Sequence, residues 1–301
     1  HLSIRRQRQM CIRDRFMSWE KLIKENKPLV VAGTINAYSA LLAERAGIKA
    51  IYLSGGGVAN ASYGLPDLAM TSREDVLEDV RRIRSASELP LLVDIDTGWG
   101  SALAISRSIK EMISAGASGV HIEDQVSEKR CGHRPNKEIV SSEEMVDRIK
   151  AAKDAQTDDN FLLMARTDAF AKGGLQEVID RSNAFIEAGA GAIFPEAISS
   201  LKDYEEISKN VSKPILANIT EFGMTPLFSH YELAEAGVKI VLHPLSAFRA
   251  MSKAAEKVYA TLASGGDHEG LLDKMQTRDE LYDVLDYHMY EEKIDKLFEK
   301  N

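Results

Sequence analysis

Eight short apolar runs, separated by longer amphipathic segments, constrain the fold of this chain more than any other feature of its sequence. They cover residues 29–32, 50–53, 91–95, 119–122, 161–165, 191–194, 214–217 and 239–242. Such runs between turn signals are typical of buried parallel strands. The phrases ERAGIKA, ISAGASG, IEAGAGA and AEAGVKI each place a glycine where a helix would end in the left-handed conformation. Eight strand–helix units predict a (β/α)8 barrel of the TIM type.

The first sixteen residues differ in composition from the rest of the chain. Segment 1–16 holds five arginines and one acidic residue, whereas the whole chain has a formal charge of −8. It lacks the apolar stretch of a secretory signal, so we expect a disordered leader, either a non-native extension or a mitochondrial-type presequence. Residues 17–301 are then expected to form a single barrel domain that includes C-terminal helices at about 267–301.

Charge, hydropathy and cysteine content exclude several classes of function. An acidic chain without a basic stripe argues against nucleic acid or an anionic membrane as the main partner. No apolar run approaches the roughly 20 residues of a membrane-spanning helix. The two cysteines, Cys11 and Cys131, lie far apart and do not form a disulfide framework. We therefore expect a cytoplasmic protein, with the mitochondrial matrix as the alternative only if the leader is a presequence.

Polar residues follow most of the predicted strands. Strand side chains alternate, so Tyr52 shares a face with Ser54, and Asp94 with Asp96. A single strand-end acid is most often a core polar group or a helix cap, but many on one barrel face indicate a site. The loops after the second and fourth strands are enlarged and open on that face, where their glycines could act as lid hinges. The strand-end candidates are Ser54, Asp94, Asp96, His121, Glu123, Arg166, Glu196 and Asn218.

Asp94, Asp96 and Glu123 form an all-oxygen set of candidate metal ligands. Hard oxygen ligands suit Mg²⁺ or Mn²⁺, and no second histidine joins His121 at the spacing of a zinc site. The glycine run 55–57 could cradle a carboxylate, although a flexible loop is the simpler interpretation.

Candidate groups for binding carboxylates and moving protons complete the set. Arg166, Arg249 and Arg278 could each clamp a carboxylate, or could form ordinary salt bridges. Tyr52 points inward beside Ser54 and is a candidate base, with core packing as an equal alternative. Cys131 lies in the cationic phrase KRCGHR, and such surroundings predict a lowered thiol pKa and a reactive side chain.

Six motifs together resemble the 2-methylisocitrate lyases of the isocitrate lyase and phosphoenolpyruvate mutase superfamily. The resemblance covers essentially all of residues 17–301, and KRCGH is specific for the lyase branch. The motifs are DIDTGWG (94–100), KRCGHRPNK (129–137), MARTDA (164–169), FPEA (194–197), LANITEFG (216–223) and LSAFRAM (245–251).

The resemblance implies Mg²⁺-dependent cleavage of 2-methylisocitrate to pyruvate and succinate, the carbon–carbon step of the methylcitrate cycle in propionate catabolism. It makes Cys131 the general acid, with His133 shaping its loop, and it implies a homotetramer with a swapped C-terminal helix. Residues Leu285, Met289, Ile294 and Leu297 could form the exchanged face, or could dock on the barrel. The implied substrate contacts are Ser54, Gly55, Gly56, Cys131, Gly132, Arg166, Glu196, Asn218, Ile219, Thr220, Arg249 and Arg278.

Three alternatives remain open at this stage. Isocitrate lyases use the same catalytic residues, but the resemblance to them is to considerably longer chains. A barrel with these aspartates could also decarboxylate oxaloacetate. One methyl group is worth only about 1–3 kcal/mol of discrimination, so overlap with isocitrate is expected. A non-catalytic metabolite-binding barrel is less favoured, because all the catalytic elements are present together.

Overall fold

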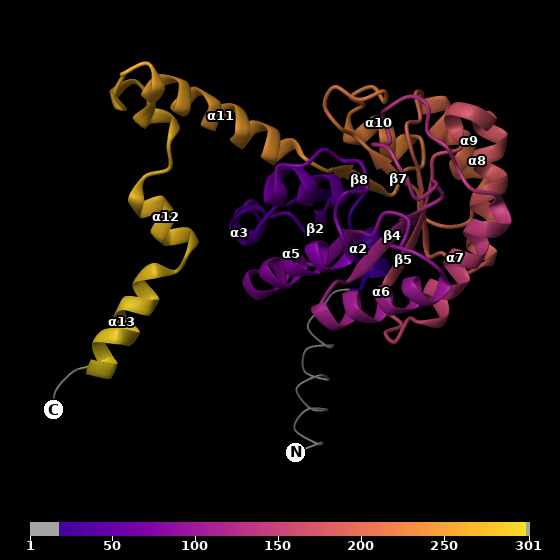
Figure 1. The fold of residues 1–301 in the computed structure, drawn as a ribbon, viewed down its shortest axis with the longest axis horizontal. Helices are drawn as coiled ribbons and strands as arrows, with labels where there is room; N and C mark the ends of the chain where they lie inside the picture. The colour runs from indigo at the N-terminus through magenta and orange to yellow at the C-terminus, as the bar shows by residue number, and fades with distance from the viewer. Residues whose placement is uncertain (1–17, 299–301) are drawn as a thin grey trace. The chain divides into compact units, whose positions relative to one another are not determined.

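The computed structural model describes residues 18–298 and contains the predicted barrel of eight parallel strands (Figure 1). Its strands pair in the order β6-β5-β4-β3-β2-β1-β8-β7, and a parallel bridge between Ile193 and Ile215 joins the two edge strands. The strands are β1 (Leu29–Gly33), β2 (Ala50–Leu53), β3 (Leu91–Asp94), β4 (Gly119–Glu123), β5 (Leu162–Thr167), β6 (Ala192–Pro195), β7 (Leu216–Asn218) and β8 (Ile240–His243). Each apolar run therefore predicted its strand to within two residues at either end.

Helices alternate with the strands and cover the outside of the barrel. Gly47, Gly116, Gly189 and Gly237, the glycines of the repeated phrase, all have the expected positive φ. Ser72 and Asp75 form a capping box at the start of one helix, and the Ser141 side chain accepts the Glu144 N–H at the start of another. The helices up to β8 are α2 (Trp19–Glu25), α3 (Ala37–Arg45), α4 (Gly55–Gly57), a π-helical turn (Val58–Ser62), α5 (Arg73–Ala86), α6 (Ala102–Ala115), α7 (Ser142–Asp154), α8 (Phe170–Glu187), α9 (Leu201–Asn210) and α10 (His230–Glu235).

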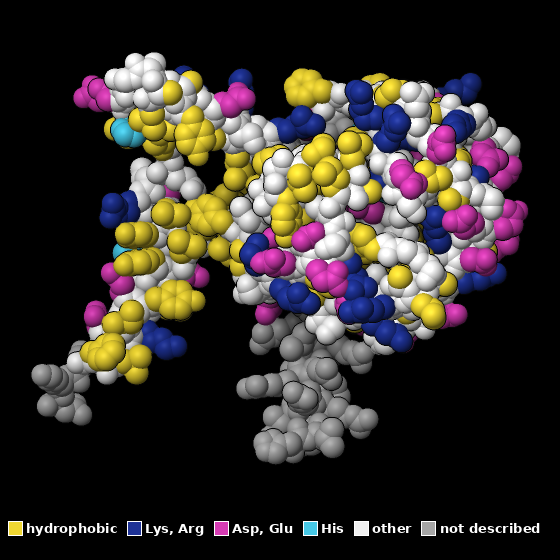
Figure 2. Space-filling view, viewed as in Figure 1, with side chains coloured by type: hydrophobic (Ala, Val, Ile, Leu, Met, Phe, Trp, Pro, Cys, Tyr) yellow, Lys and Arg dark blue, Asp and Glu magenta, His cyan; other side chains and the backbone are white. Residues whose placement is uncertain are grey.

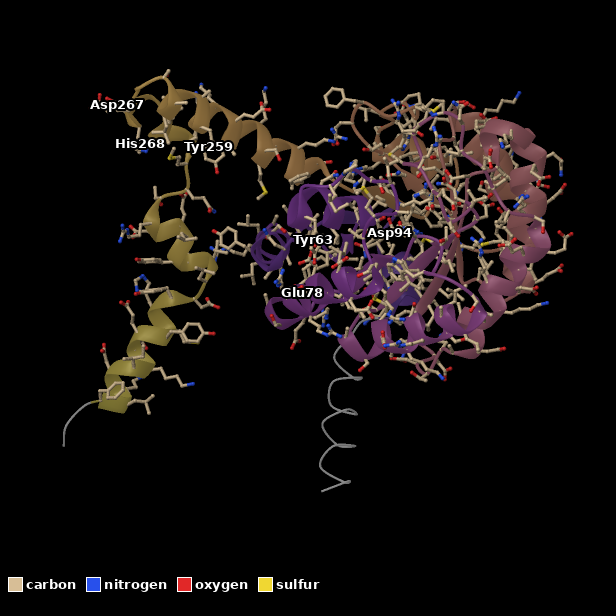
Figure 3. All side chains as sticks on the ribbon, in the orientation of Figure 1. Tyr63, Glu78, Asp94, Tyr259, Asp267 and His268 are labelled. Carbon is tan, nitrogen blue, oxygen red and sulfur yellow. The ribbon has the colours of Figure 1, made fainter. Side chains whose placement is uncertain are left out.

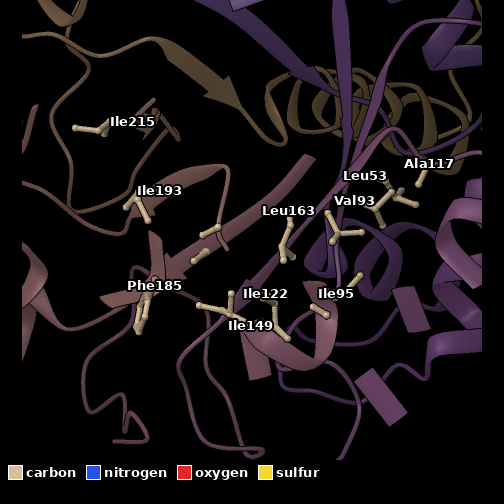
Figure 4. Packing of buried hydrophobic residues seen from close by; sticks show 14 of the residues in the cluster. Leu53, Val93, Ile95, Ala117, Ile122, Ile149, Leu163, Phe185, Ile193 and Ile215 are labelled. Carbon is tan, nitrogen blue, oxygen red and sulfur yellow. The ribbon is translucent and has the colours of Figure 1, made fainter. Parts of the chain in front are cut away.

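Two apolar layers hold this architecture together, one on each face of the strands. Leu92, Met164 and Leu242 belong to the layer inside the barrel, while Val93, Leu163 and Val241 pack between strands and helices. Figure 4 shows Val93 and Leu163 among the residues of this outer layer. Neighbouring strand residues thus point to opposite layers, as the alternation requires. Trp19 and Leu22 of α2 join the inner layer, and the Trp19 indole N–H donates to the carbonyl of Ser118 at 2.9 Å. The interior of the barrel is therefore closed by apolar packing at its amino-terminal end.

The chain divides after Ser246 into two compact units. The second unit contains α11 (Ser246–Ala263) from its second residue onward, a 3₁₀ turn (Glu269–Lys274), α12 (Arg278–Val284) and α13 (Tyr287–Phe298). Its helices carry many exposed apolar side chains (Figure 2). These include the four named from the sequence: Leu285, Met289, Ile294 and Leu297.

Three expectations from the sequence concern the leader, the domain boundaries and membrane-spanning helices. Segment 1–16 lies outside the described residues, and the single domain over 17–301 stays a prediction. Within residues 18–298, no helix has both the length and the apolar character needed to cross a bilayer.

Candidate active site

The carboxyl-terminal ends of the strands bring together the polar side chains that the sequence predicted for a site. Asp94 follows Leu92 by two residues, and Arg166 follows Met164 in the same way, so both point inside the barrel. Figure 3 shows Asp94 among the densely packed side chains of the barrel unit. The buried members of this group are Asp94, Asp96, His121, Glu123, Arg166, Glu196 and Asn218.

The glycine run after β2 lies directly against the two aspartates. The Gly55 N–H donates to Asp94 Oδ2 at 3.1 Å, and the Asp96 N–H donates to Asp94 Oδ1 at 3.0 Å. A Cβ atom on Gly55 would lie 3.0 Å from Asp96 Oδ1 and 3.2 Å from Asp94 Oδ2. Asp96 itself has a φ of +48°, which costs a residue with a side chain on the order of 1 kcal/mol. Glycine is thus needed at position 55 because its backbone lies close to the carboxylates of Asp94 and Asp96. The Gly55 N–H donates to Asp94 in this structure.

Lys129 joins the two enlarged loops to the aspartate pair. Its ammonium nitrogen lies 2.6 Å from Asp67 Oδ1 in the loop after β2 and 2.6 Å from Asp96 Oδ1 after β3. Burial alone would lower the pKa of Lys129, but Asp96, Glu123 and other carboxylates raise it well above its ordinary value. Lys129 therefore stays charged. The sequence pattern identifies Lys129 only as a cationic neighbour of Cys131 and does not identify Asp67, because a contact between two loops leaves no periodic pattern.

Arg166, near the end of β5, is a second buried cation of the site. Its guanidinium lies 3.2 Å from Glu123 Oε2, 3.0 Å from Asp168 Oδ2 and 3.3 Å from Glu196 Oε2. Burial alone would lower the pKa of Arg166, but these three carboxylates raise it. The guanidinium carbon also lies 5.3 Å from the centre of the Phe194 ring. Arg166 is thus a fixed positive charge at the mouth, held by three carboxylates.

The acidic residues near Lys129 fit a divalent cation. Burial raises the pKa of Asp96 to about 6 despite Lys129 beside it, and the nearby charge of Asp94 adds to this. Glu123 Oε1 is fully buried and accepts no hydrogen bond from residues 18–298. No three His, Cys, Asp or Glu side chains in that range converge tightly enough to hold a metal alone. Mg²⁺ suits such a site, since it typically binds one or two carboxylates and keeps waters or substrate oxygens as its other ligands.

The loop that carries KRCGH lies over this mouth. A Cβ atom on Gly132 would overlap Arg166 Nη2 and Glu196 Oε2, so only glycine can sit there. Lys137 donates to the Gly132 carbonyl at 2.6 Å and pairs with Asp168. Gln125 Nε2 donates to the Arg130 carbonyl at 2.9 Å. The loop is therefore fastened to the strand ends from both sides of Cys131.

The expectation that its cationic neighbours lower the thiol pKa of Cys131 is wrong. The pKa is raised, first because the side chain is largely buried and then because Asp67 and Glu196 lie near it. Arg166 and a hydrogen bond from the His133 backbone oppose the rise without cancelling it. Burial outweighs the charges because the loop is folded onto the barrel. Cys131 is consequently a protonated thiol at neutral pH, which is the form that can donate a proton.

His133 has a fixed tautomer in this arrangement. Its Nδ1 accepts the Met224 N–H at 3.0 Å, which assigns the ring proton to Nε2. That nitrogen lies 3.3 Å from Glu196 Oε1, to which Asn218 Nδ2 also donates at 3.3 Å. Asn218 Oδ1 is buried and accepts no hydrogen bond within residues 18–298. The site thus keeps one carbonyl acceptor open beside the Glu196 carboxylate.

Tyr52 lies inside the barrel against His121. Its hydroxyl oxygen is 2.8 Å from His121 Nε2 and 3.4 Å from Asp94 Oδ2, and the two rings stack with centroids 5.7 Å apart. Burial raises the pKa of Tyr52 well above its ordinary value and lowers that of His121 to about 4. Both groups are neutral at pH 7, and a proton could pass between them along a single hydrogen bond.

The remaining predicted site residues fall in three places. Ser54 and Gly56 lie at the start of the loop after β2, with Gly56 packed against Asp67. Thr220 is buried just beyond β7, whereas Ile219 packs in the layer between strands and helices. Arg249 lies on α11 and Arg278 starts α12, both in the second unit, so their part in the site stays a prediction.

Comparison with known proteins agrees with this geometry. The model of the phosphoenolpyruvate phosphomutase family matches residues 19–263. The 2-methylisocitrate lyase of Vibrio cholerae is 59% identical, with 92% of each chain covered. That of Escherichia coli is also 59% identical, covering 93% of this chain and 95% of its own. The structure of phosphonopyruvate hydrolase in complex with oxalate and Mg²⁺ is 28% identical with a TM-score of 0.79, covering 91% of this chain and 95% of that one. The chain therefore belongs to the phosphoenolpyruvate phosphomutase family, in its branch of 2-methylisocitrate lyases, and is an enzyme of the lyase class.

Proposed function

We propose that this enzyme cleaves 2-methylisocitrate to pyruvate and succinate, using Mg²⁺ held by Asp94 and Asp96 with Glu123 beside them. One observation carries the proposal: the KRCGH loop is seated on the strand ends through Lys129 on one side of Cys131 and Gly132 on the other. That seating puts a protonated thiol near Asp67, Glu196 and the buried Arg166. The relatives named 2-methylisocitrate lyase support the choice of substrate.

Binding of a tricarboxylate would use the fixed charges and open polar groups of the mouth. Arg166 would hold one carboxylate, since a guanidinium binds it through two parallel hydrogen bonds. The open Asn218 Oδ1 suits a hydroxyl or a protonated group of the ligand. Further contacts would come from Ser54, Gly55, Gly56, Cys131, Gly132, Glu196, Ile219, Thr220, Arg249 and Arg278, with Ile219 using its backbone.

The reaction begins with removal of the proton from the substrate hydroxyl. Tyr52 would accept this proton while passing its own along the 2.8 Å hydrogen bond to His121 Nε2. When bound, Mg²⁺ or Mn²⁺ would polarise the hydroxyl and the adjacent carboxylate, which makes the proton easier to remove. The lowered pKa of His121 makes it a transient carrier of the proton and not a resting cation.

Cleavage and reprotonation complete the reaction. As the oxygen forms the carbonyl of pyruvate, the bond to the neighbouring carbon breaks and leaves its electron pair on the succinate fragment. Arg166 would stabilise the negative charge that builds on the adjacent carboxylate. Cys131 would then donate its thiol proton to that carbon, and positioned proton transfer of this kind contributes roughly 10²–10⁴-fold to the rate.

A product assay tests the proposal directly. The enzyme is incubated in parallel with 2-methylisocitrate, isocitrate and oxaloacetate, with Mg²⁺ and after treatment with EDTA. We expect pyruvate and succinate from 2-methylisocitrate at the highest rate, loss of both products with EDTA, and recovery on adding Mg²⁺. Full turnover in metal-free enzyme would refute the aspartate site. Faster conversion of isocitrate or oxaloacetate would refute the substrate assignment.

The second unit supports a proposal about assembly. Its exposed apolar side chains would be covered in a homotetramer whose C-terminal helices are exchanged between subunits. Isolated apolar residues on a surface are normal, but a set that runs along successive helices is typical of an interface.

A further inference from the structure

A cavity of about 830 Å³ lies at the amino-terminal end of the barrel. Leu162 and Leu163 at the start of β5, Gly191 just before β6 and Ile215 just before β7 all line it. The candidate active site lies at the carboxyl-terminal ends of these strands, so the two are at opposite ends of the barrel. A volume of roughly 300–1,000 Å³ is typical of small-molecule sites in proteins.

Five lysines surround this cavity, although the chain as a whole is acidic with a formal charge of −8. They come from separate parts of the sequence and converge only in the fold. They are Lys24 on α2, Lys27 before β1, Lys153 on α7, Lys213 before β7 and Lys239 before β8. The acidic side chains in the lining are Glu20 and Asp159. The cavity therefore carries an excess of three positive charges over its acidic groups.

None of these five lysines forms a salt bridge with another of residues 18–298. Lys153 donates to the side-chain amide of Gln156 at 3.1 Å. Lys24, Lys27, Lys213 and Lys239 form no salt bridge with any of residues 18–298. Like charges that converge on a concave surface repel one another and focus a positive potential there. A bound anion would relieve that repulsion.

We propose that this cavity binds a small organic polyanion whose charged groups are carboxylates or phosphates. The lysines would bind its anionic oxygens as mobile point charges, which suits a ligand carrying several such groups. Trp19, Phe161 and Ile215, which are nearly fully buried core residues, give the cavity an apolar floor. The carbon skeleton of the ligand would rest on this floor. The site is independent of the proposed lyase chemistry.

Calorimetric titration of the full-length chain tests the proposal with two probes, citrate for carboxylates and ATP for phosphates, in Mg²⁺-free buffer. The test variant carries Lys213→Ala and Lys239→Ala. The matched control carries Lys110→Ala and Lys172→Ala, which removes the same charge from exposed positions outside the cavity. We expect at least one probe to bind the unmodified chain and the control equally. The test variant should bind it roughly tenfold more weakly or worse, since a hydrogen bond to a charged group contributes at least that much.

The outcomes separate the possible ligands and the possible sites. Binding of citrate alone would identify the ligand class as polycarboxylates, and binding of ATP alone would identify it as phosphate esters. Failure of both probes to bind would overturn the proposal. Equal affinity in the test variant and the control would also overturn it, since the anion would then be bound elsewhere, for example at the active site. Unchanged lyase turnover in both double variants would show that the fold is intact.

Tryptophan fluorescence gives a second, local readout. The chain has two tryptophans, and Trp19 lines the cavity whereas Trp99 follows β3 and donates to the carbonyl of Thr71. In a Trp99→Phe background, emission comes from Trp19 alone. We expect it to change over the same probe concentrations that give heat, and to stay constant when Lys213 and Lys239 are also replaced. An unchanged Trp19 signal during calorimetric binding would place the anion outside this cavity.

Discussion

At the scale of single residues, Cys131 shows burial and charge acting in opposite directions on one group. The cations beside it in the sequence favour a thiolate, but the folded loop shields the thiol from much of the water and brings Asp67 and Glu196 near it. Burial is the larger effect, so the proton stays on sulfur. A proton donor needs this state, whereas a nucleophile needs the opposite one.

Replacing Cys131 with alanine should reduce the turnover of 2-methylisocitrate by about 10²–10⁴-fold, because the positioned donor is lost. Succinate should still bind, since Arg166 and Asn218 are unchanged, and calorimetry would measure this. Cys11→Ser, which replaces the other cysteine of the chain, is the control and should leave turnover unchanged. Near-normal turnover of Cys131→Ala would exclude the thiol as the acid.

The raised pKa of Cys131 also predicts its reactivity toward iodoacetamide. Only the thiolate reacts, so alkylation should be slow at neutral pH and should rise as pH increases through the pKa of Cys131. That rise should occur at higher pH than for free cysteine, because burial raises this pKa. The measurement follows alkylation by mass spectrometry in Cys11→Ser protein. Rapid alkylation at pH 7 would instead match the lowered pKa that the cationic sequence alone predicts.

At the scale of secondary-structure elements, alternation along strands made most of the site predictable. Once β3 and β5 were located from their apolar runs, the inward positions of Asp94 and Arg166 followed from the alternation of side chains along each strand. The contacts of Lys129 with Asp67 and Asp96 did not follow, because they join loops far apart in the sequence. The same is true of the Lys137–Asp168 pair. Periodic patterns fix which way a strand residue points, whereas loop contacts depend on the closed barrel.

The KRCGH loop provides the sharpest prediction at this scale. Gly132→Ala would place a methyl group on Arg166 and Glu196, so the loop must lift away from the mouth. A shift of about 1 Å in catalytic geometry can cost roughly 10²-fold in rate, and we expect kcat to fall by that order. The measurement is steady-state turnover of 2-methylisocitrate together with thermal unfolding. The unfolding temperature should change little, since the loop lies outside both core layers.

Gly270→Ala is the matched control for this substitution. A methyl group on Gly270 would meet no atom within 4 Å, and the residue has no positive φ, so alanine should be tolerated there. The turnover of this variant should equal that of the unmodified enzyme. If Gly132→Ala also retained full turnover, the seating of the loop on Arg166 and Glu196 would not be needed for catalysis.

At the scale of the whole molecule, the interior of the barrel is apolar at its amino-terminal end and charged at its carboxyl-terminal end, where the candidate lyase site lies. Trp19 and Leu22 close the amino-terminal end with apolar contacts, while buried charges occupy the carboxyl-terminal end. The buried charges there stand next to partners of opposite sign, as Arg166 does with its three carboxylates. Removing one partner would leave a charge buried and unpaired, which is more costly than never having the pair. Stability and activity are therefore linked for these paired charges at the mouth.

The exposed apolar side chains of α13 give a prediction about assembly. Ile294→Asp puts a carboxylate into the proposed interface, where burying an unpaired charge costs several kcal/mol. We expect the tetramer to dissociate to smaller species, measured by size-exclusion chromatography with light scattering. Lys293→Asp, at the adjacent position that is not part of the apolar set, is the control and should remain tetrameric. A chain that is monomeric before any substitution, or an Ile294→Asp variant that stays tetrameric, would contradict an interface built from this helix.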